Sequence, residues 1–202
     1  MFGNRIEDFK GMHRGKRLFI LASGPSLRDA GLWQLRHRLV MGLNRSCLIY
    51  PYSHYHCVMD ERLFTEYGTE LRRTRCLFTL PGRPFGVPIK FLGGEGFSAD
   101  LSAGIYSGYT VSYFALQVAV YMEFAQVFFV GLDLNHRNGS THFFGYDYHS
   151  KDHEGSEYPK MRRMLEAGSA QAWSRGVEVY NCSPTTTLET MPRMDFAQAV
   201  AL

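Results

Sequence analysis

Near its start the chain changes abruptly from an apolar run, Leu18 to Ala22, to a Ser-Gly-Pro-Ser sequence. The run is too short for a helix and indicates a strand buried on both faces of a parallel sheet. Gly24 permits a tight turn and a close approach of the backbone, and Pro25 fixes φ just before the next element. Ser26 is a good N-cap for a helix that would continue through Leu35. The segment therefore predicts a β-α unit of an α/β fold.

This turn has two interpretations. The backbone amides and the dipole of a helix start favour an anion such as phosphate, and nucleotide sites in open α/β sheets lie at this end of the strands. Alternatively, the turn is only a well-capped connection between a strand and a helix. It is neither a Walker loop, because no Gly-Lys-Ser/Thr follows, nor the three-glycine dinucleotide fingerprint. The rest of the chain must decide between a site and a simple turn.

The 202 residues are enough to bury one sizeable core, and we expect a single domain over residues 1–202. The 45% hydrophobic and 20% charged residues are typical of a soluble globular protein. The net charge of +3 is only mildly basic, so it weakly favours an anionic ligand and gives no reason to expect a nucleic-acid partner. No apolar run approaches the ~20 residues of a membrane span.

The N-terminus and the cysteines indicate the compartment. Residues 1–10 mix acidic and basic side chains and are unlike a signal peptide. The cysteines are far apart, without a Cys-x-x-Cys pattern, and are predicted to be reduced and buried. They are Cys47, Cys57, Cys76 and Cys182. We therefore expect a cytoplasmic protein, with association at the inner face of the membrane left open.

Short apolar strands alternate with helical segments along the chain. The predicted strands span residues 18–22, 39–44, 55–60, 75–80, 88–92, 126–130 and 177–182. The predicted helices include residues 111–124 and 159–174. This alternation predicts a Rossmann-like α/β domain, with a mostly parallel sheet and helices on both faces. Residues 1–15 form an N-terminal extension, residues 134–158 an active-site loop, and the apolar segment 192–202 packs either on this core or on a second copy.

Polar residues stand where several predicted strands end. In a parallel sheet all strands end at the same edge, so these residues, together with the predicted helix start at Ser107-Gly108, are expected to converge. Each alone is explained as a cap or a turn former, but together they predict a ligand site. The strand-end residues are Ser23, Asn44, Asp60, Asp133 and Ser183.

The segment from Asp133 to Glu154 contains half of the 8 histidines. Histidine with carboxylates can hold zinc or another divalent ion, but the segment has no His-x-x-x-His spacing, and we predict no metal site. A neutral imidazole also serves as a general base near neutral pH. His142 is the candidate because the neighbouring Phe143-Phe144 pair would partly desolvate it.

Taken in order, these segments resemble the bacterial sialyltransferases of glycosyltransferase family 42. They also resemble a larger related set of pterin diphosphokinase-like and flagellar accessory proteins. The resemblance spans residues 17–192 and rests on motifs in the family's order. They are Ala22-Ser23-Gly24-Pro25-Ser26-Leu27, Gly42-Leu43-Asn44, Ser107-Gly108, Gly131-Leu132-Asp133, Thr141-His142-Phe143-Phe144-Gly145 and Asn181-Cys182-Ser183-Pro184.

The resemblance implies a glycosyltransferase that moves sialic acid or a related nine-carbon acidic sugar from a CMP-linked donor to a glycan acceptor. His142 would deprotonate the acceptor hydroxyl in an inverting displacement that requires no metal or other cofactor. The family's lid is absent here, and Tyr146 and Tyr148 would take the place of the lid tyrosines. The predicted catalytic residues are His142 and Asp133, and the predicted substrate-binding residues are Ser23, Gly24, Pro25, Ser26, Asn44, Asp60, Ser107, Gly108, Tyr146 and Ser183.

Two alternatives stay open at this stage. A diphosphokinase similar to the pterin enzymes would move pyrophosphate from ATP and would need Mg²⁺, with Asp60 and Asp133 as ligands. A non-catalytic module would bind a nucleotide or a glycan, and the 14% aromatic content suits sugar stacking. The acceptor and the oligomeric state do not follow from the sequence.

Overall fold

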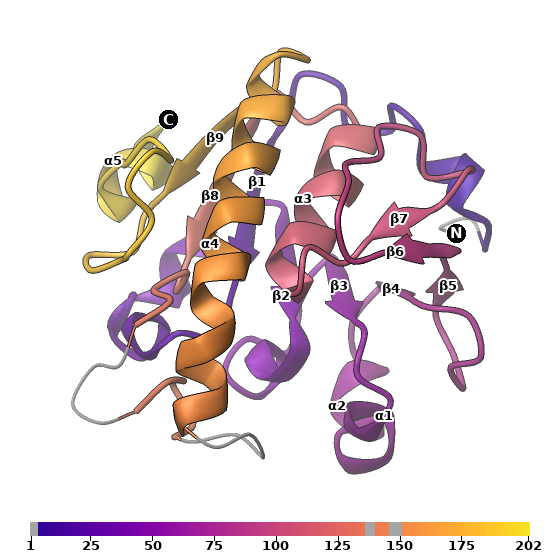
Figure 1. Cartoon of the computed structure of the whole chain (residues 1–202), viewed down its shortest axis with the longest axis horizontal. Coiled ribbons are helices and arrows are strands. Elements are labelled where there is room, and N and C mark those ends of the chain that lie inside the picture. The colour runs from indigo at the N-terminus through magenta and orange to yellow at the C-terminus, as the bar shows by residue number, and fades with distance from the viewer. Residues whose placement is uncertain (1–3, 136–139, 146–150) are drawn as a thin grey trace.

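The computed structural model describes residues 4–135, 140–145 and 151–202, with residues 151–155 described by their backbone alone. Its centre is a seven-stranded sheet of order β5-β4-β3-β2-β1-β8-β9 (Figure 1). Every pairing within it is parallel. The strands are β1 (Arg17–Leu21), β2 (Val40–Leu43), β3 (Tyr55–Val58), β4 (Cys76–Thr79), β5 (Val87–Pro88), β8 (Gln126–Val130) and β9 (Glu178–Asn181). The predicted fold class is confirmed.

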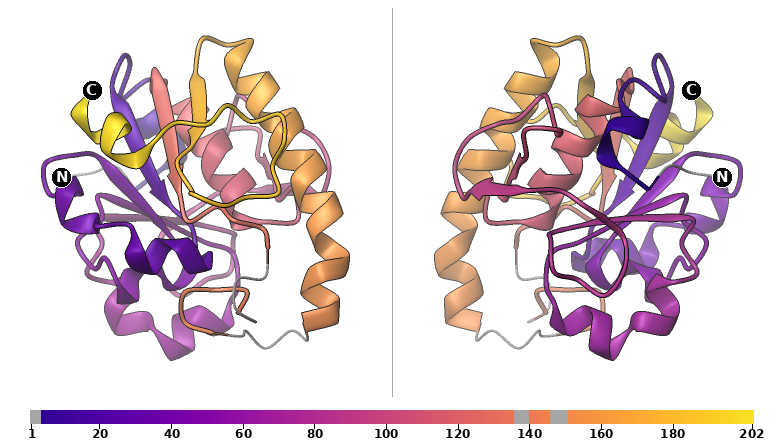
Figure 2. Two further views of the ribbon diagram at one scale, coloured as in Figure 1. Left: turned by 90° about the vertical axis from the view of Figure 1, so that its left-hand side faces the viewer. Right: turned by 90° about the vertical axis from the view of Figure 1, so that its right-hand side faces the viewer.

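The central strand β1 explains why both faces of the sheet are covered. Its side chains alternate, so Leu18 and Ile20 pack into one core while Phe19 and Leu21 pack into another. α3 (Val111–Tyr121) and α4 (Lys151–Trp173) cover the first face. The 3-10 helices η2 (Pro25–Asp29) and η3 (Leu32–Leu35) cover the second together with α5 (Phe196–Ala201). Figure 2 shows α4 and α5 on opposite sides of the sheet.

Short elements complete the fold. β6 (Phe91–Gly93) and β7 (Ile105–Tyr106) form a separate two-stranded parallel sheet. η1 (Ile6–Phe9) precedes β1, η4 (Asn44–Leu48) follows β2, and α1 (Arg62–Glu66) and α2 (Gly68–Leu71) follow β3. The chain moves outward from β1 to β5 and then returns to β8 on the other side of β1, so the strand order reverses between β1 and β8.

Three predicted elements differ from the structure. The helix predicted from Ser26 to Leu35 is two 3-10 helices, because Gly31 between them takes the left-handed conformation at φ 61°. The strand predicted over residues 88–92 is broken between β5 and β6, which belong to different sheets. α4 begins at Lys151 rather than at Pro159, so the predicted loop 134–158 is helical in its last part. A proline inside a helix removes one backbone donor, and α4 tolerates this loss.

The chain's two ends pack on its own core. Phe9 of the N-terminal extension is fully buried, with its ring centroid 4.9 Å from that of Phe78. Ala199 of α5 is 1% exposed, and the ring centroid of Phe196 lies 6.2 Å from that of Phe19. The C-terminal helix therefore covers the sheet of its own chain.

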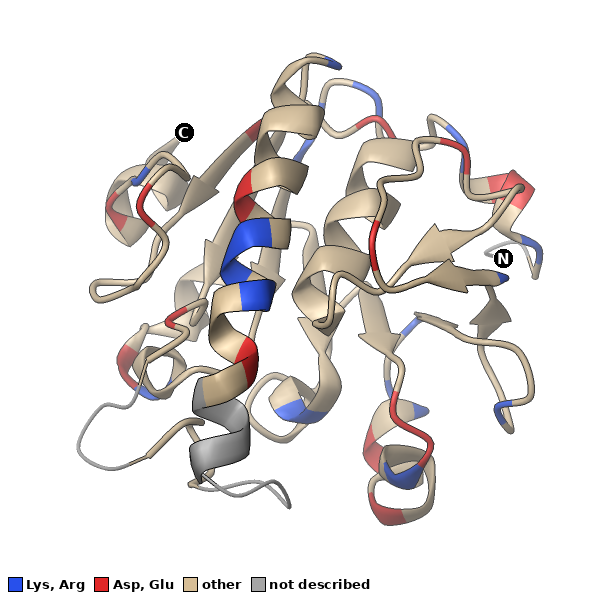
Figure 3. Cartoon of the chain, in the orientation of Figure 1, with Lys and Arg blue, Asp and Glu red and all other residues tan. Residues whose placement is uncertain are grey.

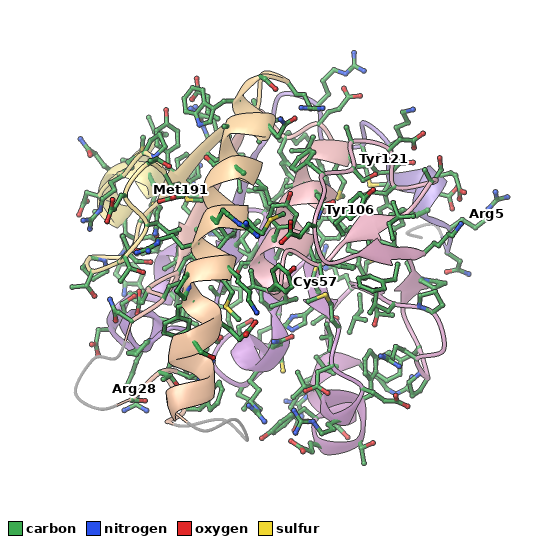
Figure 4. The ribbon with its side chains drawn as sticks, viewed as in Figure 1. Arg5, Arg28, Cys57, Tyr106, Tyr121 and Met191 are labelled. Carbon is green, nitrogen blue, oxygen red and sulfur yellow. The ribbon has the colours of Figure 1, made fainter. Side chains whose placement is uncertain are left out.

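The predicted state of the cysteines is confirmed, because all four are free and buried. Cys57 lies in the interior of the molecule (Figure 4). Burial raises the pKa of the Cys47 thiol to about 11 and that of Cys182 to about 12, so both thiols are protonated at neutral pH. Among the described helices, none has the length and apolar character that crossing a membrane requires.

Replacing Phe9 with alanine tests whether the N-terminal extension is part of the core. Removing a fully buried ring leaves a cavity, so Phe9→Ala is expected to lower the free energy of unfolding by about 3–5 kcal/mol, measured by urea denaturation. Phe91 is 48% exposed, and Phe91→Ala is the matched control, with an expected change below about 0.5 kcal/mol. Equal stabilities of the two variants would show that the extension contributes nothing.

Candidate functional site

A cavity of about 320 Å³ lies at the carboxyl ends of β1, β2, β3 and β8, and includes the point where the strand order reverses. Ligands of open α/β sheets bind at such a point. The beginning of α3 and residues of α4 form its remaining walls. The polar residues that line it are Ser23, Asn44, Asp60, Arg62, Tyr109, Thr110, Ser112, Asp133, Thr141, His142 and Tyr158.

Gly24 allows the β1–η2 turn to lie against the end of β8. Its amide donates to the carbonyl of Gly131 over 2.8 Å. A Cβ atom on residue 24 would lie 2.5 Å from that carbonyl oxygen and 2.7 Å from Cγ of Asp133, which is too close for either. Gly24 has an ordinary φ of −64°, so the glycine is required for space and not for an unusual backbone angle. The predicted close approach is confirmed, with the protein's own strand as the neighbour.

Asp133 occupies the start of η2, where the sequence predicts a phosphate. Its Oδ2 accepts a hydrogen bond of 2.8 Å from the amide of Ser26, and its Oδ1 accepts one of 2.5 Å from the Ser26 hydroxyl. The prediction that Ser26 caps this helix is therefore wrong: Gly24 stands at the N-cap position, Pro25 follows it, and the Ser26 hydroxyl donates to Asp133, which follows β8. The carboxylate supplies the negative charge that a helix start favours.

Asn44 follows β2 in a conformation that few residues adopt. Its φ is 47°, in the left-handed region where asparagine is enriched. The carbonyl of Asn44 lies 2.8 Å from Nε2 of His56, which is fully buried. Burial lowers the pKa of His56 to about 4, so the neutral ring donates this hydrogen bond at neutral pH. Oδ1 of Asn44 is buried and, within the described part of the chain, has no hydrogen-bond partner.

Asp60 and Arg62 form a pair on the side of the cavity next to β3. Nη2 of Arg62 lies 2.7 Å from Oδ2 of Asp60, and the Arg62 amide also donates to this carboxylate. These hydrogen bonds lower the pKa of Asp60, so it is ionised at neutral pH. Basic and acidic residues are interspersed along the elements around the sheet (Figure 3).

The beginning of α3 faces the cavity. Thr110 is the N-cap, and its hydroxyl accepts the amide of Ser112 over 3.3 Å. Ser112 is 4% exposed and lines the cavity. The helix predicted over residues 111–124 begins at Val111 as expected and ends at Tyr121. Ser107 and Gly108, expected to open this helix, form the turn before its Thr110 cap.

His142 lies in a short hairpin, residues 140–145, beside the β1–η2 turn. The backbones of His142 and Gly145 form an antiparallel bridge, and the amide of Phe143 donates to the carbonyl of Ser23 over 2.9 Å. The Arg28 guanidinium also donates to the carbonyl of Phe143. Nδ1 of His142 lies 2.8 Å from Oγ1 of Thr141. The hairpin is therefore anchored to the turn that carries Ser23 and Gly24.

The structure brings together one group of the predicted site residues. Those that line the cavity are Ser23, Gly24, Asn44, Asp60, Asp133 and His142. Pro25, Ser26, Ser107 and Gly108 are near lining residues in the sequence but do not line it. Ser183 is also outside, because its hydroxyl accepts the amide of Leu132 below the site. Tyr146 and Tyr148 lie outside the described residues.

Other lining residues were missed by the sequence predictions. Tyr109, Thr110 and Ser112 belong to the start of α3, and Arg62 to the start of α1. Tyr158 lies on α4, in a segment that the sequence assigns to a loop. The described residues contain no group of three or more His, Cys, Asp or Glu side chains suited to a metal ion. His136 and His149, and the side chain of His153, lie outside what the structure describes.

The fold is similar to that of solved sialyltransferases. Two structures of the sialyltransferase CstII from Campylobacter jejuni match with TM-scores of 0.54 and 0.52, each at 12% sequence identity. The first is a complex with cytidine-5'-monophosphate and covers 90% of this chain and 85% of that one. The second is a complex with CMP-3FNeuAc and covers 89% and 85%. The sequence matches no protein-family model and no curated protein.

The contact at Gly24 is tested by a pair of glycine variants. Because the new Cβ would overlap the Gly131 carbonyl and Asp133, Gly24→Ala is expected to lower the free energy of unfolding by about 1–3 kcal/mol. Gly68 begins α2, and a Cβ atom on it would have no neighbour within 4 Å among the described residues. Gly68→Ala is therefore expected to leave stability unchanged or raise it by up to about 1 kcal/mol. Urea denaturation of both variants measures the difference, and a neutral Gly24→Ala contradicts the close packing of this turn.

Proposed function

We propose that this protein is a glycosyltransferase that moves sialic acid or a related nine-carbon acidic sugar from a CMP-linked donor to a glycan acceptor. One observation carries the proposal. His142 lines the same cavity as Asn44, whose buried Oδ1 has no hydrogen-bond partner among the described residues. A buried amide oxygen without a partner is costly unless a ligand satisfies it. The fold shared with the CMP-bound structures supports a cytidine nucleotide as that ligand.

The start of α3 supports the binding of the donor's negative charge. Backbone amides at a helix N-terminus favour an anion, and Ser112 beside them is a buried residue that lines the cavity. A phosphate or a sugar carboxylate of the donor would accept hydrogen bonds there. The start of η2 is not used in this way, since Asp133 already occupies it. Asp133 then acts by holding the β1–η2 turn, which presents Ser23 and Gly24 to the cavity.

His142 is the proposed general base. In the tautomer whose Nδ1–H donates to Oγ1 of Thr141, Nε2 is the basic nitrogen. It takes the proton of the acceptor hydroxyl while that oxygen attacks the anomeric carbon of the donor sugar. The bond from the anomeric carbon to the phosphate oxygen breaks, and CMP leaves with the bonding electron pair. This single displacement inverts the anomeric centre and uses the protein for orientation and charge stabilisation.

The acceptor would approach from the other side of His142. A second cavity, of about 380 Å³, is also lined by His142, together with Arg28, Asp29 and Ser140. Charged and hydroxyl side chains of this kind bind the hydroxyl groups of sugars through hydrogen bonds. An imidazole that lines both cavities supports the proposal of a base that acts on an acceptor in one and a donor in the other.

The alternative diphosphokinase reaction gains no support from the described residues. It needs carboxylates that can bind Mg²⁺ beside the triphosphate of ATP. Both oxygens of Asp133 are engaged by Ser26, and Asp60 is engaged by Arg62. A non-catalytic nucleotide-binding module remains the second candidate, because the cavity and the unpartnered Asn44 oxygen serve binding as well as transfer.

Thermal unfolding with a panel of nucleotides tests the ligand. CMP at about 100 times its Kd is expected to stabilise the protein by about 2.7 kcal/mol and to raise Tm without Mg²⁺, whereas UDP, GDP and ATP are not. Ser112→Ala should reduce the shift by CMP, because the proposed anion contact is lost. Ser169 is likewise a buried serine but belongs to α4 and does not line the cavity, so Ser169→Ala is the matched control. A Mg²⁺-dependent shift by ATP alone would instead support pyrophosphate transfer.

Turnover of the donor tests the base. His142→Ala is expected to lower kcat with a CMP-sugar by about 10²–10⁴-fold, because proton transfer from the acceptor is lost, while the Tm shift by CMP is retained. His37→Ala is the control, since His37 lies in the segment between η3 and β2, away from the cavity. Release of CMP from a CMP-sugar donor in the presence of glycan acceptors gives the rate. Unchanged turnover in His142→Ala would remove this residue from the mechanism. If the native protein itself shows no turnover, the result favours the non-catalytic nucleotide-binding module.

A further inference from the structure

Arg45 is a buried cation directly after Asn44. It is 6% exposed, and its Nη2 lies 3.6 Å from Oε2 of Glu66. Its guanidinium carbon lies 4.6 Å from the centre of the Phe144 ring and 5.5 Å from that of Tyr67. A guanidinium over the face of an aromatic ring is attracted by the ring's electron density, and more strongly where water is excluded. Arg45 is therefore held at the junction of η4, α1 and the hairpin of residues 140–145.

Phe144 connects this cation to His142. The two ring centroids are 4.8 Å apart and their planes differ by 16°, which is a stacked arrangement. His142 and Gly145 form the bridge that closes the hairpin around Phe144. The guanidinium, the phenyl ring and the imidazole thus form a continuous series of contacts from η4 to the cavity.

We infer that Arg45 and Phe144 are positioning residues that hold the imidazole of His142 in the orientation needed to deprotonate an acceptor. The inference rests on the proposed function, since it gives His142 its role. Neither residue is among those that line the 320 Å³ cavity proposed for the donor, whereas Phe144 also lines the 380 Å³ cavity proposed for the acceptor. Because Asn44 and Arg45 are consecutive, the same turn of η4 supports a residue proposed to contact the donor and the contact that orients the base.

Misplacing a catalytic group by about 1 Å can cost about 10²-fold in rate without loss of substrate binding. Leucine in place of Phe144 keeps an apolar side chain but removes the flat face on which the imidazole rests. Methionine in place of Arg45 keeps a long side chain but removes the charge that holds the ring. Both changes should therefore lower kcat, while the KM for the donor changes little.

A merely structural role for the two residues predicts a different result. The variants would then lose stability, but the folded fraction would turn over donor at the native rate. Phe85 supplies a matched control, because the guanidinium carbon of Arg72 lies 3.8 Å from its ring centre and neither residue lines the cavity. Phe85→Leu removes the same kind of contact at a place where no catalytic group depends on it.

The experiment compares Phe144→Leu, Phe144→Tyr, Arg45→Met and Phe85→Leu in the full chain, with folded fraction measured by thermal unfolding. We expect kcat for a CMP-sugar donor to fall about 10- to 100-fold in Phe144→Leu and Arg45→Met. Phe144→Tyr, which keeps the ring, should restore the rate, and Phe85→Leu should match the native protein. If Phe144→Leu and Arg45→Met turn over like Phe85→Leu, the inference is overturned.

A second readout does not depend on turnover. Protons of His142 that face the Phe144 ring experience its ring current, so their NMR signals should move in Phe144→Leu and in Arg45→Met, but not in Phe85→Leu. If the native protein shows no transfer while these signals move, the proposed function fails and the stack remains as a structural arrangement. If the signals of His142 are the same in Arg45→Met and the native protein, Arg45 does not position the ring.

Discussion

The contact between Asp133 and Ser26 joins the two halves of the molecule at the place where the strand order reverses. β1 leads into four strands on one side, and β8 begins the strands on the other. Both oxygens of the Asp133 carboxylate bind Ser26, and Gly24 donates to Gly131 just beside them. Asp133 is 1% exposed, and a hydrogen bond to a charged group contributes about 1.5–3 kcal/mol to stability. The cavity, the hairpin that carries His142 and the packing of η2 over the sheet all depend on the contact between Asp133 and Ser26.

The same junction shows how far the sequence predicts the structure. Short apolar runs alternating with helical segments predict the parallel sheet, because burial on both faces demands such runs. Topology then predicts that Ser23, Asn44, Asp60 and Asp133 meet, since parallel strands end at one edge. Topology did not predict which group accepts a hydrogen bond from the amide of Ser26 at the start of η2. Ser26 and Asp133 are 107 positions apart, and no local pattern distinguishes a carboxylate of the protein from the phosphate of a ligand.

Other residues escaped prediction for local reasons. Proline is common at the first position of a helix, so the sequence predicts that the helix begins at Pro159 and that Tyr158 lies in a loop. In the structure α4 begins at Lys151 and passes through the proline. Gly42 belongs to the Gly42-Leu43-Asn44 motif, but the sequence does not show why glycine is needed there: a Cβ on it would lie 2.4 Å from Nδ1 of His56. That glycine makes room for the buried imidazole beneath Asn44. The conformation of Asn44 thus depends on two residues whose roles only the packed structure shows.

The two sides of the cavity are held with different strength. On the strand side, Asn44, Arg45 and Asp133 are fixed by buried contacts with His56, Phe144 and Ser26. On the opposite side, the segment of α4 near Tyr158 is tied to the loop before α3 through Glu95. This carboxylate accepts the Tyr109 hydroxyl over 3.0 Å and the Arg163 guanidinium.

Arg163 and Glu95 are both more than half exposed, and exposed ion pairs contribute only about 0–1 kcal/mol. The carboxyl-terminal part of α4 is different, because Leu165 and Ala172 are fully buried in the core. The carboxyl-terminal part of α4 is therefore held by burial in the core, to which the exposed ion pair at Arg163 adds little.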